Sequence, residues 1–362
     1  MSNLTNLQAL LKESQVHGAI LSSPLTQRYI TGFDYTDGYV LVSIDRAWLL
    51  ADSRYVEAAR NSVSEDIQVI CPEVSMLDTL AQLTQFNALT KIVLEDQTLS
   101  CAAYKKLSEK LAGTNLYTGA SEMVTRLRAV KNEEELAIIA EAQDITDRAF
   151  EHILTFIKPG VTERQVAFEL ENFMRMNGAE DIAFETIAVS GPATSMPHGV
   201  PADIPLREGF LTMDFGAKVK GYCSDMTRTV VLGKATAEMK KVYETVLAAQ
   251  TAALEMLGEG VVCREADEAA RSVIREAGFG EYFGHSLGHG VGIEIHEAPN
   301  LSPKAPEDSK LRRGNVVTVE PGIYIAGQFG CRIEDMVAID LEGNLLNFTK
   351  SPKELIEIPF EV

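Results

Sequence analysis

The stretch of sequence that offers the most chemistry is 284–297, G-H-S-L-G-H-G-V-G-I-E-I-H-E. Its first five letters fit G-x-S-x-G, in which Ser286 would be the nucleophile of a serine hydrolase. The same stretch sets three histidines, His285, His289 and His296, among glycines, as a metal site would. The two interpretations require different partner residues elsewhere in the chain.

The serine hydrolase interpretation fails on the residues around Ser286. Such an enzyme needs an acidic residue and then a histidine downstream of the serine, each on a separate loop. The histidines that follow Ser286 are His289 and His296, which are too close to it in sequence to fold back as triad partners. The preceding E-A-G-F-G-E-Y-F is no convincing strand, and G-H-G-V-G is a poor start for a helix. The sequence therefore favours the metal site.

A hairpin predicted over residues 209–232 carries a first pair of acidic residues. With its turn at Val219–Lys220, Asp214 and Asp225 are predicted to lie directly opposite each other. Their Cβ atoms would then be about 5 Å apart on one face of the sheet. Two bare carboxylates at this distance repel each other unless a cation lies between them.

A second predicted hairpin, centred on Gly327, carries another acidic pair. Glu320 and Glu334 are symmetric about this glycine, although Pro321 interrupts the strand and leaves their exact opposition open. A single acidic residue is usually exposed, but acidic pairs inside apolar strands must be paired or coordinated.

Four carboxylates and one histidine form an oxygen-rich ligand set for two divalent ions. Such a set suits manganese or cobalt better than a thiolate site would, with zinc as an alternative. Two ions about 3.5–4 Å apart can activate a bridging hydroxide and polarise a carbonyl.

Composition excludes several other functions. The chain has 362 residues, 46% of them hydrophobic, which allows two domains with sizeable cores. Its net charge of −19 argues against a nucleic-acid partner. No signal peptide is recognisable, and no apolar run approaches the roughly 18 residues that span a membrane. Five scattered cysteines without a C-x-x-C pair argue against a disulfide framework. We therefore expect a cytoplasmic protein without membrane partners.

Two domains are predicted, 1–122 and 123–362. The first alternates short apolar runs such as G-A-I-L-S-S with helical patterns, as in a small α/β domain. In the second, capping boxes at Asn132–Glu135 and Thr162–Gln165 each predict the start of a helix.

An internal repeat with an offset of 100 residues runs through the second domain. G-V-T-E-R-Q-V at 160–166 matches G-V-V-C-R-E-A at 260–266, and Arg175 and Gly178 match Arg275 and Gly278. Each segment precedes a strand pair of the same kind, which predicts two related halves.

The sequence from about residue 125 onward resembles the pita-bread metallopeptidases, which include methionine aminopeptidase, aminopeptidase P, proline dipeptidase and creatinase. The resemblance is carried by S-G-P-A-T-S-M-P-H-G, D-F-G-A-K-V-K-G-Y-C-S-D-M-T-R-T, F-G-H-S-L-G-H-G-V-G-I-E-I-H-E-A-P, V-E-P-G-I-Y-I and R-I-E-D. It implies an α+β fold, in which a curved antiparallel sheet with pseudo-twofold halves is covered by helices. The first domain is similar to the smaller α/β domain that precedes this fold in the creatinase and proline-cleaving branches.

The resemblance also implies a ligand set for two metal ions. The positions that match the family's ligands are Asp214, Asp225, His289, Glu320 and Glu334. In the family, the residue at Glu320 also takes the proton of the nucleophilic water, and the arginine at Arg332 orients the ligands.

Four further positions match residues that meet the substrate. His198 and His296 match histidines that bind the substrate carbonyl and assist proton transfer. His285 matches a residue of the pocket for proline, and Tyr324 is expected to line the same region.

Within the family, the N-terminal domain argues against methionine aminopeptidase, and the complete ligand set argues against creatinase, which works without metal. Proline-directed peptidases remain, and the family implies a homodimer. Many proline dipeptidases carry an arginine after H-E-x-P, where this chain has Asn300. The sequence thus predicts an Xaa-Pro aminopeptidase like aminopeptidase P, acting on peptides with proline at the second position. An Xaa-Pro dipeptidase is the alternative, and a non-catalytic peptide-binding protein on the same scaffold is a third.

Overall fold

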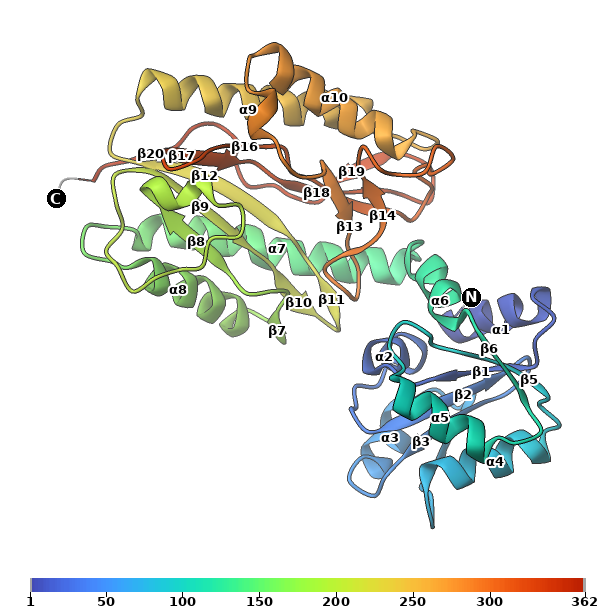
Figure 1. Cartoon of the computed structure of the whole chain (residues 1–362). Helices are drawn as coiled ribbons and strands as arrows, with labels where there is room; N and C mark the ends of the chain where they lie inside the picture. The colour runs from blue at the N-terminus through green and yellow to red at the C-terminus, as the bar shows by residue number, and fades with distance from the viewer. Residues whose placement is uncertain (1, 361–362) are drawn as a thin grey trace. The chain divides into compact units, whose positions relative to one another are not determined.

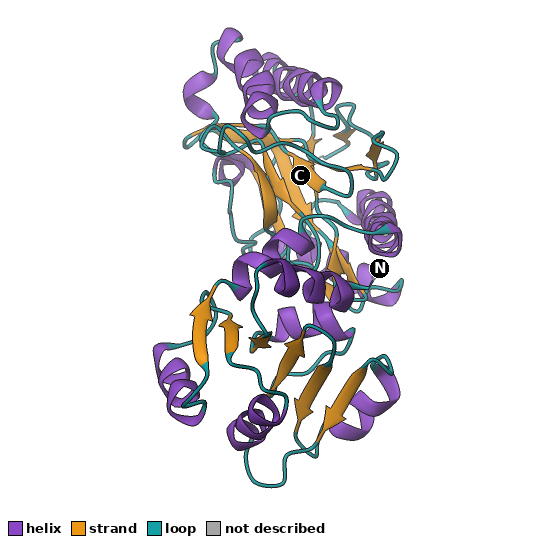
Figure 2. Cartoon of the chain, turned by 90° about the vertical axis from the view of Figure 1, so that its right-hand side faces the viewer, coloured by secondary structure: helices purple, strands orange, loops and turns teal. Residues whose placement is uncertain are grey.

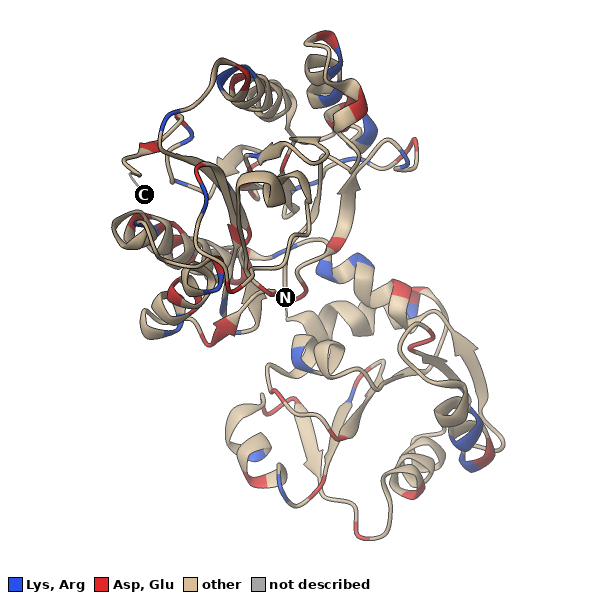
Figure 3. Cartoon of the chain, turned by 60° about the vertical axis from the view of Figure 1, so that its left-hand side comes forward, with Lys and Arg blue, Asp and Glu red and all other residues tan. Residues whose placement is uncertain are grey.

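The computed structural model describes residues 2–360, which divide into two compact units between Leu127 and Arg128 (Figure 1). Along the chain, the boundary between the units falls within helix α6 (Ala120–Arg128), which also contains residue 122, the end of the first domain predicted from the sequence. Acidic and basic residues are spread over both units (Figure 3). Among residues 2–360, no helix is long and apolar enough to cross a membrane.

The first unit is built on a six-stranded sheet with the order β4-β3-β2-β1-β5-β6, around which its helices pack (Figure 2). Its core is formed by apolar side chains of the sheet such as Ile20, Leu41 and Trp48, all buried. The strands are β1 (Gly18–Leu21), β2 (Gly38–Ser43), β3 (Ala47–Ala51), β4 (Ile67–Ile70), β5 (Lys91–Leu94) and β6 (Asn115–Thr118). The helices before α6 are α1 (Asn3–Glu13), α2 (Pro24–Thr31), α3 (Val56–Ser62), α4 (Met76–Phe86) and α5 (Cys101–Lys110).

The second unit holds its strands between two helix pairs, α7 with α8 and α9 with α10 (Figure 1). The helices are α7 (Glu133–Phe156), α8 (Glu163–Met176), α9 (Ala237–Met256) and α10 (Cys263–Glu276), with short 3-10 turns η1 (Gly191–Ser195) and η2 (Gly280–Tyr282). The strands of the first half and of the C-terminal end are β7 (Asp181–Ile182), β8 (Ile187–Ser190), β9 (Gly209–Phe215), β10 (Ala217–Val219), β11 (Tyr222–Cys223), β12 (Met226–Leu232) and β20 (Glu357–Ile358). Those of the second half are β13 (Gly288–Gly290), β14 (Glu297–Leu301), β15 (Val316–Val319), β16 (Gly322–Ile325), β17 (Phe329–Arg332), β18 (Asp335–Ile339) and β19 (Leu345–Asn347).

Both predicted capping boxes are present in the second unit. The Asn132 side chain accepts from the backbone N–H of Glu135, whose own side chain accepts from the backbone of Asn132. Thr162 and Gln165 form the same reciprocal pair at the start of α8. Each box satisfies backbone donors that a helix N-terminus otherwise leaves free.

The internal repeat is confirmed by corresponding elements at the predicted offset. Helices α8 and α10 start and end 100 residues apart. Before each helix, a single β-bridge joins the chain to a later segment, Thr162 to Pro205 in the first half and Val262 to Lys310 in the second. The repeated glycines adopt the same left-handed conformation, with φ of 86° at Gly160 and 85° at Gly260.

The predicted register of the first hairpin is wrong by two residues. In the structure Asp214 pairs with Thr227 across β9 and β12, so Asp225 is a diagonal neighbour of Asp214 on the same face. The reason is the turn, which is formed by Lys220 and Gly221 with φ of 45° and 88°. A tight hairpin turn of this kind needs positive φ at both central residues, which glycine adopts readily and a β-branched valine does not.

The predicted register of the second hairpin is confirmed on both sides of its interruption. Ile325 pairs with Phe329 in β16 and β17, and Val319 pairs with Asp335 in β15 and β18, so that both segments are centred on Gly327. Glu320 and Glu334 lie between these paired segments. Their backbone N–H groups donate to Leu287 and Thr227 instead.

Candidate active site

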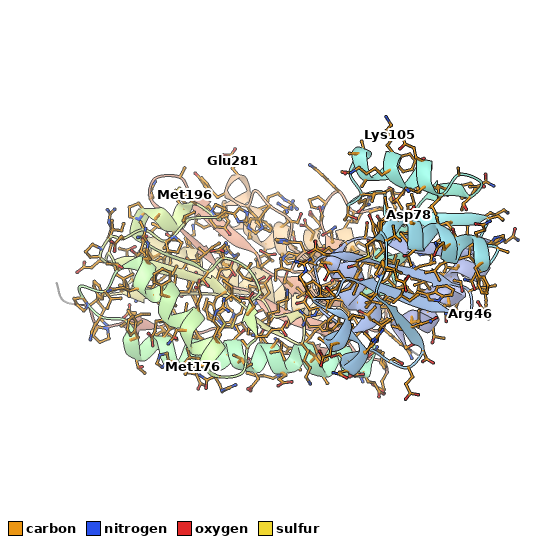
Figure 4. All side chains as sticks on the ribbon, turned by 90° about the horizontal axis from the view of Figure 1, so that it is seen from below. Arg46, Asp78, Lys105, Met176, Met196 and Glu281 are labelled. Carbon is orange, nitrogen blue, oxygen red and sulfur yellow. The ribbon has the colours of Figure 1, made fainter. Side chains whose placement is uncertain are left out.

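A cavity of about 670 Å³ in the second unit collects most of the predicted site residues. The nine that line it are His198, Asp214, Asp225, His285, His289, His296, Glu320, Arg332 and Glu334. Its wall also includes apolar residues such as Phe184, Ile187 and Ile295. Met196, labelled in Figure 4, is exposed and directly precedes the lining residue Pro197.

The most compact group of candidate ligands is Asp225, His289 and Glu334. One donor atom from each lies within 4.8 Å of the other two. His289 Nε2 is 3.6 Å from an Asp225 carboxylate oxygen and 3.3 Å from Glu320 Oε1. Its other ring nitrogen, Nδ1, donates to the backbone carbonyl of Gly290 over 3.0 Å. This bond orients the ring so that Nε2 faces the carboxylates, as in metal-binding histidines.

Glycines on both sides of His289 allow its strand to enter the site. A Cβ atom at Gly288 would lie 2.0 Å from the Thr318 carbonyl oxygen, and one at Gly290 would lie 2.3 Å from that of Ala298. No real side chain tolerates such contacts. The glycines therefore let β13 fit between β14 and β15 and bring the imidazole to the acidic residues of the hairpins.

The carboxylates that line the cavity outnumber the basic side chains that could compensate their charge. Burial raises the pKa of Asp225 well above its usual value, and the nearby carboxylates of Glu334 and Asp214 raise it further. Burial likewise raises the pKa of Glu334, as do Glu320 and Asp214. Among residues 2–360, no group forms a hydrogen bond with the buried Oδ1 of Asp214. Since buried carboxylates must be paired or coordinated, this donor set fits divalent cations.

Glu320 differs from the other carboxylates. Burial alone would raise its pKa, but the hydrogen bond from His289 and the charges of His289, His285 and Arg332 lower it to about 2. The side chain of Glu320 is therefore ionised at neutral pH.

Arg332 links the acidic residue Asp214 to Tyr324 through hydrogen bonds. Its Nη2 donates to Asp214 Oδ2 over 2.5 Å, and its Nη1 donates to the Tyr324 hydroxyl over 2.9 Å. That hydroxyl is 3.0 Å from Nε2 of His285, whose Nδ1 donates to the backbone carbonyl of Ser286. The tyrosine thus lies behind His285 and Arg332, not in the cavity wall where the sequence placed it.

Two buried threonines hold carboxylates in the site, and the sequence analysis did not select either. The Thr227 hydroxyl donates to Glu334 over 2.7 Å and accepts from Nε of Arg332. The Thr318 hydroxyl donates to Glu320 over 3.1 Å and accepts from the backbone N–H of His289. The available signal was spacing, since each threonine lies two residues from an acidic residue, on the same side of an extended chain.

The remaining predicted histidines lie in the same cavity. The ring centroid of His296 is 4.4 Å from that of His289, with the rings at 62°. Burial lowers the pKa of His296, and so does the charge of His289. His198 lines the cavity from the segment that follows η1. This arrangement places the neutral imidazole of His296 beside a cluster of potential metal ligands.

Comparison with known proteins gives the family. Residues 137–340 match the model of metallopeptidase family M24, and residues 3–130 match the creatinase/prolidase N-terminal domain. The chain belongs to metallopeptidase family M24. The predicted family and the two-domain pita-bread fold are thereby confirmed, as is the expectation of a metal-dependent hydrolase.

Relatives of this M24 peptidase match it over nearly its whole length. It is 35% identical to an Xaa-Pro dipeptidase of Pyrococcus furiosus over 98% of this chain and 99% of the relative. The solved structure of an Xaa-Pro dipeptidase from Bacillus anthracis is 41% identical, with a TM-score of 0.93 and 98% of each chain covered. That of an X-Pro aminopeptidase from Thermotoga maritima is 35% identical, with a TM-score of 0.91 and coverage of 99% and 100%. The similarities support the alternative prediction, a dipeptidase, better than the aminopeptidase that Asn300 suggested.

Proposed function

We propose that this M24 peptidase is an Xaa-Pro dipeptidase that depends on divalent metal ions. The observation that carries the proposal is the group formed by Asp225, His289 and Glu334, whose donor atoms lie within 4.8 Å of one another in a cavity. Its similarity to Xaa-Pro dipeptidases over nearly the full chain supports the substrate class.

The ions would be held by the donor set on the two hairpins and β13. Its members are Asp214, Asp225, His289, Glu320 and Glu334. Manganese is the proposed metal because four of the five ligands supply carboxylate oxygen, with cobalt or zinc as alternatives. Bound divalent ions lower the pKa of water and polarise the scissile carbonyl.

The protein side chains would bind the substrate and move its protons. Glu320, ionised in this environment, accepts the proton of the attacking water. His198 and His296 bind the substrate carbonyl and assist transfer of the proton to the proline nitrogen. His285 packs at the proline ring. A dedicated site is needed because the X-Pro bond has no N–H and a fixed ring geometry.

A second function, Xaa-Pro aminopeptidase action on longer peptides, is favoured by Asn300. This residue lines the cavity where many dipeptidases carry an arginine for the terminal carboxylate. Hydrolysis of an Xaa-Pro dipeptide and an Xaa-Pro-Xaa tripeptide with added manganese compares the two. We expect a kcat/KM about tenfold higher for the dipeptide, because the chain is similar over nearly its full length to Xaa-Pro dipeptidases, a difference of about 1.4 kcal/mol in binding of the transition state. A higher value for the tripeptide would identify an aminopeptidase, and no turnover of either would contradict both functions.

We further propose a homodimer in the cytoplasm. The dimer follows from the resemblance to the creatinase-like branch, and light scattering on the purified protein measures it. The compartment is supported by the cysteines, which are all free, with Cys223, Cys263 and Cys331 buried as thiols.

A further inference from the structure

A buried charge cluster lies beside the candidate active site but outside its cavity. It consists of Arg128, Lys131 and Glu297, which we call the Glu297 clamp. Glu297 directly follows His296, Arg128 is the last residue of α6, and Lys131 lies between α6 and α7. The side chains of Lys131 and Glu297 are buried, with exposed fractions of 1% and 2%, and that of Arg128 is largely buried, with an exposed fraction of 10%.

Both oxygens of the Glu297 carboxylate accept hydrogen bonds within the clamp. Its Oε1 accepts from Nη2 and Nε of Arg128 over 2.7 and 3.2 Å. The same oxygen accepts from the backbone N–H of Glu294 over 2.9 Å, and Oε2 accepts from Lys131 Nζ over 3.2 Å. Burial raises the pKa of Glu297, but the charges of Lys131 and Arg128 outweigh it and lower the pKa below the usual value. The carboxylate is therefore ionised and held from several directions.

The clamp brackets the two cavity residues Ile295 and His296. Arg128 reaches both ends of this dipeptide, because its Nη2 also donates to the Glu294 carboxylate over 2.8 Å. The carboxylate also packs against Gly292, where an added Cβ would lie 2.6 Å from Glu297 Oε2. The loop from 291 to 296 has no regular secondary structure, so these side-chain contacts take the place of a hydrogen-bond ladder.

The basic side of the clamp is anchored independently. The backbone N–H of Lys131 donates to the Gly314 carbonyl over 2.8 Å. The Asn315 side chain donates to the Ala129 carbonyl over 2.6 Å. Both anchors lie just before β15, which leads into Glu320. The segment that holds Glu297 is thus tied to the strand that carries a candidate metal ligand.

The imidazole of His296 has few other constraints. No group in the part of the chain from 2 to 360 forms a hydrogen bond with it, and its one close ring neighbour is His289. Its position is therefore set by the backbone of its loop, which the clamp holds at Glu294 and Glu297.

We propose that Arg128, Lys131 and Glu297 are positioning residues that hold the His296 imidazole in the active-site cavity. The inference rests on the proposed function, since His296 acts there on the substrate. None of the three side chains lines the cavity, so their effect would pass through the backbone of 294–297. A displaced imidazole would slow proton transfer while the metal ligands stay in place.

Two variants of the clamp and one matched control test this role in the full-length, metal-loaded protein. E297Q keeps the length of the side chain and removes its charge, and R128K keeps the positive charge but cannot fork between two carboxylates. R275K makes the same change in an exposed ion pair with Glu268 on α10. Measurements are kcat and KM for an Xaa-Pro dipeptide, metal content and thermal unfolding. The NMR signals of the histidine rings are recorded on zinc-loaded protein, because zinc is diamagnetic and does not broaden them.

We expect kcat to fall about 10- to 100-fold in E297Q and less in R128K, with KM and metal content close to wild type. The His296 ring signals should shift or broaden in both variants. Those of His152, which pairs with Glu169 between α7 and α8, should stay unchanged, as should all signals in R275K.

Wild-type kcat and unmoved His296 signals in folded R128K would overturn the proposal. If E297Q does not fold, R128K decides alone, because it preserves the charge balance of the cluster. If wild-type protein hydrolyses no Xaa-Pro peptide, the proposed function fails, whereas the NMR comparison still shows whether the clamp positions His296.

Discussion

Thr227 shows how one uncharged side chain serves two charged groups at the candidate metal site. It is fully buried, donates to Glu334 and accepts from Arg332, which itself binds Asp214. The hydroxyl therefore orients a carboxylate from the second half of the unit and the arginine that holds a carboxylate from the first. Hydrogen-bond partners of metal ligands commonly set metal affinity in this way.

Replacing Thr227 by valine should weaken metal binding by about 10- to 100-fold, because the shape is kept while Glu334 loses its donor. It should also lower the free energy of unfolding by about 1–3 kcal/mol, since Nε of Arg332 loses its acceptor. Calorimetric titration with manganese and chemical denaturation measure the two effects. T245V is the control, because that hydroxyl bonds only within its own helix, to Lys241. Equal manganese affinity in T227V and wild type would contradict the role.

Removal of metal should make stability depend on pH through Asp225 and Glu334. Their folded-state pKa values are raised, so the folded protein binds protons that the unfolded chain has released. Stability without metal is therefore highest below the unfolded pKa of about 4 and falls as the pH rises through the raised values.

Bound cations reverse this effect because they compensate the ionised carboxylates. The difference in Tm between manganese-loaded and EDTA-treated protein should widen from about pH 5.5 to about pH 7.5. Scanning calorimetry at several pH values measures it. A constant difference across this range would show that these carboxylates do not carry the raised pKa.

At the scale of elements, the turn of the first hairpin decides which residues face one another. Lys220 and Gly221 both have positive φ, and this turn pairs Asp214 with Thr227. The turn therefore places Thr227 directly opposite Asp214 across β9 and β12. It also places Asp225 diagonally from Asp214 on the same face of the sheet.

Substitution of Gly221 by alanine should lower the free energy of unfolding by about 1–2 kcal/mol, because an L-residue resists the left-handed conformation. G258A is the matched control, since Gly258 has no positive φ and an added Cβ there meets no atom within 4 Å. Urea denaturation of both variants compares them. If G221A is as stable as wild type, the turn does not have this geometry.

At the scale of the whole second unit, its two related halves each supply one acidic hairpin, and buried charges join them. Arg228 on β12 donates to Asp335 on β18 over 2.8 Å, and both side chains are almost fully buried. Its other nitrogens donate to backbone carbonyls, including that of Glu334. This arginine therefore fastens the C-terminal strands to the first half next to the site.

Loss of Arg228 should destabilise the protein strongly, because Asp335 and several carbonyls lose a buried partner. We expect R228M to lower the free energy of unfolding by about 3–5 kcal/mol. R148M, which breaks the exposed pair of Arg148 with Asp144, should cost less than about 1 kcal/mol. Denaturant unfolding measures both, and similar losses in the two variants would argue against a joining role for Arg228.

Sequence alone was sufficient for features set by local chemistry and by motifs. The capping boxes at Asn132 and Thr162, the repeat at an offset of 100 and the hairpin centred on Gly327 were all predicted correctly. Each depends on residues within a few positions, or on a pattern that recurs along the chain. The family was also predicted, because its motifs keep residue types and spacing that metal chemistry requires.

Only the tertiary structure decided which distant side chains meet. It placed Thr227 on Glu334, Tyr324 behind His285, and Arg128 with Lys131 on Glu297. The register of the first hairpin is a different case, because the turn at Lys220 and Gly221, where both residues have positive φ, is a local feature that the predicted turn missed. The physical reason is that contacts between distant side chains depend on how strands and loops far apart in sequence pack together. No short segment of the sequence contains all the residues that determine this packing.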